Sequence, residues 1–116
     1  MFGWFKKDAN WSSPVGDPES IDLIGKRKDG GVDVLVVVAH ALDLSDKTRE
    51  VLTAKLRNCC KYIVSAEFES EFGVPSEDKV NLIIRSDWEV PNEYIELMGK
   101  VATEENAPVS LLVKYQ

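Results

Sequence analysis

Apolar and polar positions alternate along several short stretches of the chain in a way that predicts β-strands. Residues 21–25 form a first short strand, and Asp29-Gly30 behind it is a hairpin signal, because glycine readily adopts the positive φ of such a turn. Residues 32–39 are apolar on nearly both faces, which is typical of a central strand. The alternation in residues 79–85 and 109–115 predicts two further strands.

Helical spacing of apolar residues marks two other segments. Ser45 is a good N-cap, and apolar residues recur every three or four positions from Leu52 to Ala66, so we expect a helix from Asp46 to near Phe68. Pro91 suits the first turn of a second helix, which residues 106–108 end.

The predicted order is therefore β-β-α-β-α-β. Strand–helix–strand units favour right-handed crossovers between parallel neighbours, and the opening hairpin adds an antiparallel strand. We expect an α/β fold of the two-layer α+β type, a mixed four-stranded sheet with two helices packed on it. Residues 1–20, an aromatic and then loop-like segment, precede a single α/β domain over residues 21–116. The second face of this sheet would need a cover.

The apolar segments and the two cysteines of the sequence favour a cytoplasmic protein. The longest apolar run, residues 34–39, is far shorter than the ~20 residues of a membrane-spanning helix, and Met1–Lys7 lacks the apolar region of a signal peptide. Adjacent Cys59 and Cys60 cannot form a standard disulfide with each other, so we expect reduced, buried thiols. The N-terminal aromatic residues would pack on the domain, on a second subunit or on a membrane surface.

The formal net charge is −6, from 14 basic and 20 acidic residues, and the acidic excess lies entirely in residues 62–116. This balance disfavours nucleic-acid binding, which needs a basic face. The first predicted helix carries a basic strip and the second an acidic strip, which would lie side by side and could meet a two-fold copy of themselves. The strips consist of Arg49, Lys55, Arg57 and Lys61, and of Glu93, Glu96, Glu104 and Glu105.

Two polar segments follow predicted strands, where α/β folds place ligand sites. His40 and Asp43 follow the second strand, and Asp87, Trp88 and Glu89 follow the third. If these strands are parallel, the five residues share one rim, which could bind a cation or let His40 act as a general base. The structural alternative, which we favour, makes Asp43 a helix cap and Trp88 a hydrophobic staple. The sequence specifies no catalytic set, metal site or cofactor.

An acidic segment lies at the end of the first predicted helix. Glu67, Glu69 and Glu71, with Phe72 beside them, could recognise a basic partner surface. The alternative is a solvated helix end whose Phe68 and Phe72 tuck under the domain.

One segment, Asp17-Pro-Glu-Ser-Ile-Asp-Leu-Ile-Gly25, resembles the D-P-x-x-I-D-L-I opening of a small bacterial family of unknown function. The resemblance extends over about residues 17–115 and carries no catalytic residue, and Leu44 stands where relatives often have an aromatic residue. Its other matching positions are Val34-Leu35, Leu42-Asp43, Lys61-Tyr62-Ile63 and Leu112-Val-Lys-Tyr115. Some small acidic bacterial proteins of this type are immunity proteins or other partner-binding modules, which is an analogy of class.

Together these observations predict a non-enzymatic protein-interaction module, whose partner is another protein or a second copy of the chain. The alternative is a small enzyme or ligand-binding domain that uses the rim of His40, Asp43, Asp87, Trp88 and Glu89.

Overall fold

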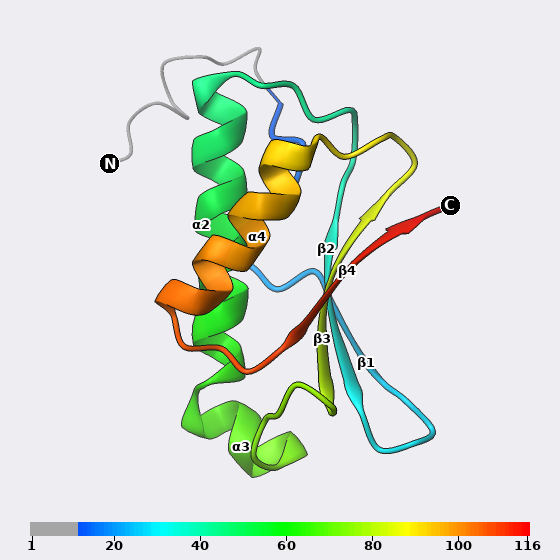
Figure 1. The fold of residues 1–116 in the computed structure, drawn as a ribbon, viewed down its shortest axis with the longest axis vertical. Coiled ribbons are helices and arrows are strands. Elements are labelled where there is room, and N and C mark those ends of the chain that lie inside the picture. Colours follow the sequence, from blue (N-terminus) through cyan, green and yellow to red (C-terminus); the bar gives the residue numbers. More distant parts are fainter. Residues whose placement is uncertain (1–11) are drawn as a thin grey trace.

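The structure is a computed structural model, and residues 12–116 are described (Figure 1). The strands occur in the spatial order β1-β2-β3-β4; β1 is antiparallel to β2, and the other neighbouring pairs are parallel. Helices α2 and α4 lie side by side against one face of this sheet (Figure 1). The expected mixed four-stranded sheet is confirmed. The elements are β1 (Leu23–Lys26), β2 (Val32–Val37), α2 (Asp46–Ile63), α3 (Ala66–Phe72), β3 (Val80–Ser86), α4 (Asn92–Glu104) and β4 (Ser110–Tyr115).

The prediction of two helices was wrong, because the segment expected as one helix from Asp46 to Phe68 is two. The order is therefore β-β-α-α-β-α-β. Ser65 causes the break: its hydroxyl donates to the carbonyl of Tyr62 and accepts from the amide of Phe68, which caps α3 as a new helix. A serine side chain that bonds the nearby backbone competes with helix continuation in this way.

The core fills the space between the sheet and the helices, and the predicted apolar faces contribute to it. Alternate residues of β2 and β3 are fully buried there, as are one stripe of α2 and one of α4. These residues include Val32, Val34, Val36, Val80, Leu82, Ile84, Leu52, Leu56, Cys59, Ile63, Met98 and Val101. Val15, from the segment that patterning sets before the domain, also belongs to the core, and the carbonyl of neighbouring Pro14 accepts from Ala39.

The hairpin predicted at Asp29-Gly30 joins β1 to β2. Gly30 has a φ of 89°, which glycine adopts without steric cost. Arg27 bridges the turn, with ion pairs of 3.2 Å to Asp29 and 2.5 Å to Asp33. The hairpin end of the sheet is therefore held by short-range charge pairs.

A buried ion pair ties the recognisable Asp17–Gly25 segment to α2. Lys55 is fully buried, and its Nζ lies 2.6 Å from Asp22 Oδ1 and 2.8 Å from the carbonyl oxygen of Asp17. Lys55 therefore does not belong to an exposed basic strip.

Among the described helices, none is long and apolar enough to cross a membrane.

Candidate functional site

The five rim residues lie at one end of the sheet. Because β2 and β3 are parallel, the segments that follow them, with His40 and Asp43 on one and Asp87, Trp88 and Glu89 on the other, leave the sheet at the same end (Figure 1). This common position is what the rim hypothesis requires first. Whether it forms a site depends on what each side chain contacts.

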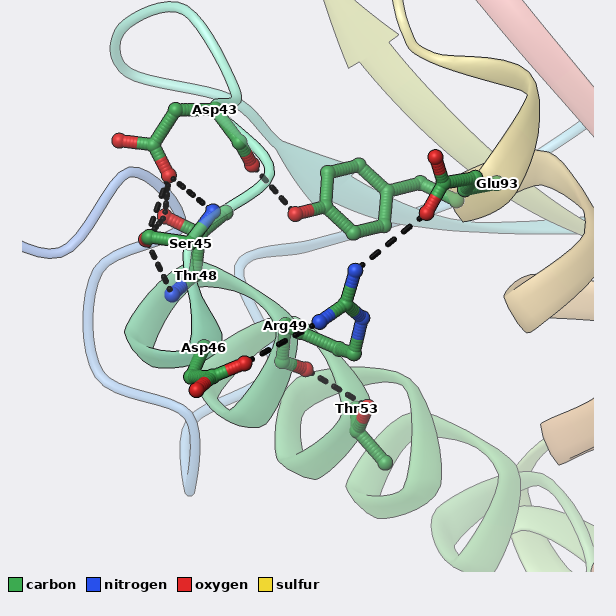
Figure 2. Close-up of polar contacts among 8 residues, drawn as sticks. Asp43, Ser45, Asp46, Thr48, Arg49, Thr53 and Glu93 are labelled. Carbon is green, nitrogen blue, oxygen red and sulfur yellow. Dashed lines mark hydrogen bonds and ion pairs between the residues drawn. The ribbon is translucent and has the colours of Figure 1, made fainter.

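Asp43 is engaged in the cap of α2, as Figure 2 shows. Its Oδ1 accepts hydrogen bonds from the Ser45 amide (3.0 Å), the Ser45 hydroxyl (2.6 Å) and the Thr48 hydroxyl (2.7 Å). These bonds, led by the Ser45 hydroxyl, lower the pKa of Asp43, and the charge of His40 adds the smallest contribution. The Tyr94 hydroxyl donates to the Asp43 carbonyl. A carboxylate held in this way fixes the helix start and is a poor base near neutral pH.

His40 contacts the segment that precedes β1. Its Nε2 lies 3.0 Å from the carbonyl oxygen of Ser12, and because a carbonyl only accepts, this nitrogen carries the proton. The ring itself is exposed to solvent. The hydrogen bond gives His40 a positioning role for residues 12–15.

Asp87 and Glu89 line a shallow hollow of about 460 Å³ together with Tyr115. Neither His40 nor Asp43 lines it, so this hollow brings together only part of the predicted rim. The Ser86 hydroxyl holds the turn by accepting from the Trp88 amide (2.9 Å) and donating to the Trp88 carbonyl (2.6 Å).

Trp88 is exposed, and Val90 instead is buried before α4. Val90 therefore supplies the buried apolar side chain just before α4. Among residues 12–116, no group of three His, Cys, Asp or Glu side chains could hold a metal ion. The rim thus lacks the ligand set that a divalent cation needs.

The basic and acidic helix strips contact each other within the chain. Arg49 of α2 lies 3.3 Å from Glu93 of α4 (Figure 2). Both line a hollow of about 290 Å³ that extends along α4 to Lys100. Arg57 forms ion pairs of 3.3 Å with both Glu104 and Glu105. Much of the expected charge complementarity is therefore satisfied without a partner.

The acidic segment is the short helix α3. Glu67, Glu69 and Glu71 are exposed on it, whereas Phe68 is fully buried. Phe72 is half-buried and its ring packs 4.9 Å from that of Phe68. Phe72, predicted as part of a partner surface, therefore packs partly against the hydrophobic core.

Both cysteines are fully buried in α2. Burial raises the pKa of Cys59 to about 12 and that of Cys60 to about 11. Neither thiol has the thiolate character that nucleophilic chemistry needs.

The surface that sequence reasoning missed is the β4 edge of the sheet. β4 is last in the strand order of the described residues, and exposed Leu111, Leu112 and Tyr115 lie along it at 37%, 38% and 54% exposure. Ile95 of α4 is also exposed. The alternation within residues 109–115 predicted the strand but contained no signal of its place in the sheet, which depends on long-range pairing.

The face of the sheet opposite α2 and α4, which no helix of residues 12–116 covers and which we call the uncovered face, carries an apolar row that ends at this edge. The register places Leu23, Leu35, Ile83 and Leu112 opposite one another across the four strands. Ile83 is fully buried but lies outside the core cluster between sheet and helices, which is consistent with its position on the other face.

Comparison with known proteins gives no matching family model, no matching curated protein and no matching solved structure. The resemblance of residues 17–115 to a bacterial family therefore stays a prediction.

Proposed function

We propose that this chain is a non-enzymatic protein-interaction module that binds its partner along the β4 edge. The observation that carries the proposal is a sheet edge that no other strand of residues 12–116 pairs with, combined with exposed apolar side chains on both of its faces. Leu111 projects toward the helix side and Leu112 toward the uncovered side, as their partners Leu82 and Ile83 do. An edge strand offers unpaired main-chain donors and acceptors, and neighbouring apolar side chains add affinity and register.

The rim of His40, Asp43, Asp87, Trp88 and Glu89 supports a catalytic role less well than the β4 edge supports a binding role. The carboxylate of Asp43 is engaged by Ser45 and Thr48, and the Nε2 of His40 donates to a carbonyl, which leaves only its Nδ1 as a base. A general base must lie within reach of a bound substrate, whereas the hollow at this end is lined by Asp87, Glu89 and Tyr115 and not by His40. Buried, protonated thiols are compatible with a reducing cytosol, and we infer that location for the protein.

Site-specific photocrosslinking in cells of the source organism tests the proposal. A photoreactive phenylalanine analogue replaces Leu112 in one variant and Leu23 in a matched control, since both residues are exposed, belong to the same apolar row and lie on opposite edges. We expect an adduct from position 112 at several times the yield from position 23. Equal yields, or no adduct at position 112, would contradict an interface along β4.

A further inference from the structure

We propose that the occupant of the β4 edge is a second copy of this chain, paired antiparallel through β4 about a two-fold axis at Leu112. The inference rests on the proposed function and names its partner. Such a dimer would join two four-stranded sheets into one continuous sheet with the helices of both copies on the same side. Its interface is isologous, so the β4 edge must be complementary to itself.

The direction of the main-chain groups in β4 fixes which residues are free to pair. The amide of Gln116 donates to the carbonyl of Ser86 at 3.3 Å, so Gln116 points toward β3. In a parallel ladder, the main-chain N–H and C=O of one residue both point to the same neighbouring strand. The same groups of the next residue point to the opposite side. The main-chain N–H and C=O of Leu112 therefore point toward β3, whereas those of Leu111 and Val113 point away from the sheet, at its edge.

This pattern suits an antiparallel copy centred on Leu112. Leu111 of each copy would lie opposite Val113 of the other, and the two reciprocal pairs provide about four main-chain hydrogen bonds. Leu112 would meet its own counterpart in a non-hydrogen-bonded pair, where side chains are closest.

The side chains match in this register. Leu112 against Leu112 makes the apolar row of Leu23, Leu35, Ile83 and Leu112 continuous across both sheets. On the helix side, Leu111 meets Val113. A register centred on Val113 also satisfies the main-chain pattern, but it places Leu112 opposite Lys114 and loses the apolar match.

The register centred on Leu112 also keeps the charged residue of the edge away from its own counterpart. Lys114, which forms no ion pair within residues 12–116, lies opposite Ser110 of the other copy. A lysine opposite a small polar residue avoids a like-charge contact across the pair.

A hollow beside β4 leaves room for side chains of a second copy to approach the edge. A hollow of about 470 Å³ lies between α4 and the edge, with Gly99, Ala102 and Leu111 among its lining residues and Glu77 as their only charged member. Small side chains here leave room for side chains of a second copy.

The opposite edge is less suited to pairing. β1 has only four residues and contains Gly25 and a terminal Lys26, and short, glycine-containing or charged edges resist strand addition. β4 has six residues, without proline or glycine.

Light scattering coupled to size exclusion tests the dimer. At roughly 100 µM, where a micromolar dimer is nearly complete, we expect the wild-type chain at about twice its 13.0 kDa mass. Leu112→Arg places like charges directly opposite each other and should give a monomer. Leu23→Arg, the matched control, should remain a dimer. A monomeric wild type, or a dimer that Leu112→Arg leaves intact while its circular dichroism is native, would overturn the proposal. Dissociation by both variants would indicate face-to-face packing and overturn it also.

A disulfide trap tests the register independently. Leu112→Cys places two thiols in a pair with Cα atoms about 4.5 Å apart, which suits a disulfide. Mild oxidation should convert most of this variant to a covalent dimer, whereas Leu23→Cys should stay reduced, and Cys59 and Cys60 are buried in both. Equal trapping of both variants, or none of Leu112→Cys, would contradict this register.

The photocrosslink separates this inference from the function on which it rests. An adduct from position 112 with twice the chain mass supports both. An adduct of another mass keeps the interaction at the β4 edge and overturns the second copy as its occupant. An intramolecular link to residues 1–11 would assign the edge to the chain's own N-terminal segment and overturn both.

Discussion

The ion pair between Lys55 and Asp22 predicts an unequal response to removing its two members. The Lys55 side chain is fully buried, whereas 22% of the Asp22 side chain is exposed. Asp22→Ala would leave a buried ammonium with only the carbonyl of Asp17 as a partner, and would also remove the acceptor of the Val37 amide. Lys55→Met would leave a carboxylate that still reaches water and still accepts from Val37.

The magnitudes follow from this difference in exposure. Breaking a buried pair by deleting one partner costs about 3–5 kcal/mol, and we expect about 3 kcal/mol for Asp22→Ala because the site is open to solvent on one side. Lys55→Met removes the ammonium that must be desolvated and should cost only about 1 kcal/mol. The double variant should therefore be more stable than Asp22→Ala alone, by about 1–2 kcal/mol.

Equilibrium urea unfolding of the wild type, both single variants and the double variant measures these differences. Tryptophan fluorescence and circular dichroism should report coincident transitions, which licenses a two-state treatment. An equal or larger loss in Lys55→Met, or strictly additive effects in the double variant, would refute the claim that the uncompensated ammonium dominates the cost.

Three further predictions concern the thiols and the start of α2. Since burial raises the pKa of Cys59 to about 12 and that of Cys60 to about 11, native protein should react with Ellman's reagent only at the rate of unfolding, whereas urea-unfolded protein reacts at once. Ser45→Ala should cost about 1 kcal/mol of stability in urea unfolding. Because the folded pKa of Asp43 lies below its ordinary 3.8, its bonds to Ser45 and Thr48 stabilise the fold above that pH, and the stability difference between wild type and Asp43→Asn should shrink as pH falls through the folded value.

Local chemistry accounts for the elements that the sequence predicts correctly. Gly30 marks the hairpin because its turn needs a positive φ, and Pro91 marks the start of α4 because an N-terminal position needs no amide hydrogen. The break at Ser65 could not be predicted from the apolar period, which continues through it, because the bonds of the Ser65 hydroxyl to nearby backbone groups decide where α2 ends and α3 begins.

The burial of Lys55 could not be predicted in the same way. Its partners Asp17 and Asp22 are more than thirty positions away, and they are the two aspartates of the recognisable Asp17–Gly25 segment. The rim was predictable only as a position: parallel pairing of β2 and β3 brings His40 and Asp87 to one end, but side-chain contacts decide whether they converge.

The position of the charges bears directly on what kind of partner the chain suits. The basic and acidic helix strips were expected to lie side by side and to be able to meet a two-fold copy, and Glu93, Glu104 and Glu105 already pair with arginines of α2 within the chain. Such exposed pairs contribute little to stability, but they lower the net field that the helical face presents to other molecules. Charge therefore selects a partner weakly there. At the β4 edge charge matters even less, since Lys114 is the only charged residue of the strand. There, exposed apolar side chains lie beside main-chain groups that have no partner strand among residues 12–116. A partner that recognises this edge must supply a strand and apolar contacts, and another β4 supplies both.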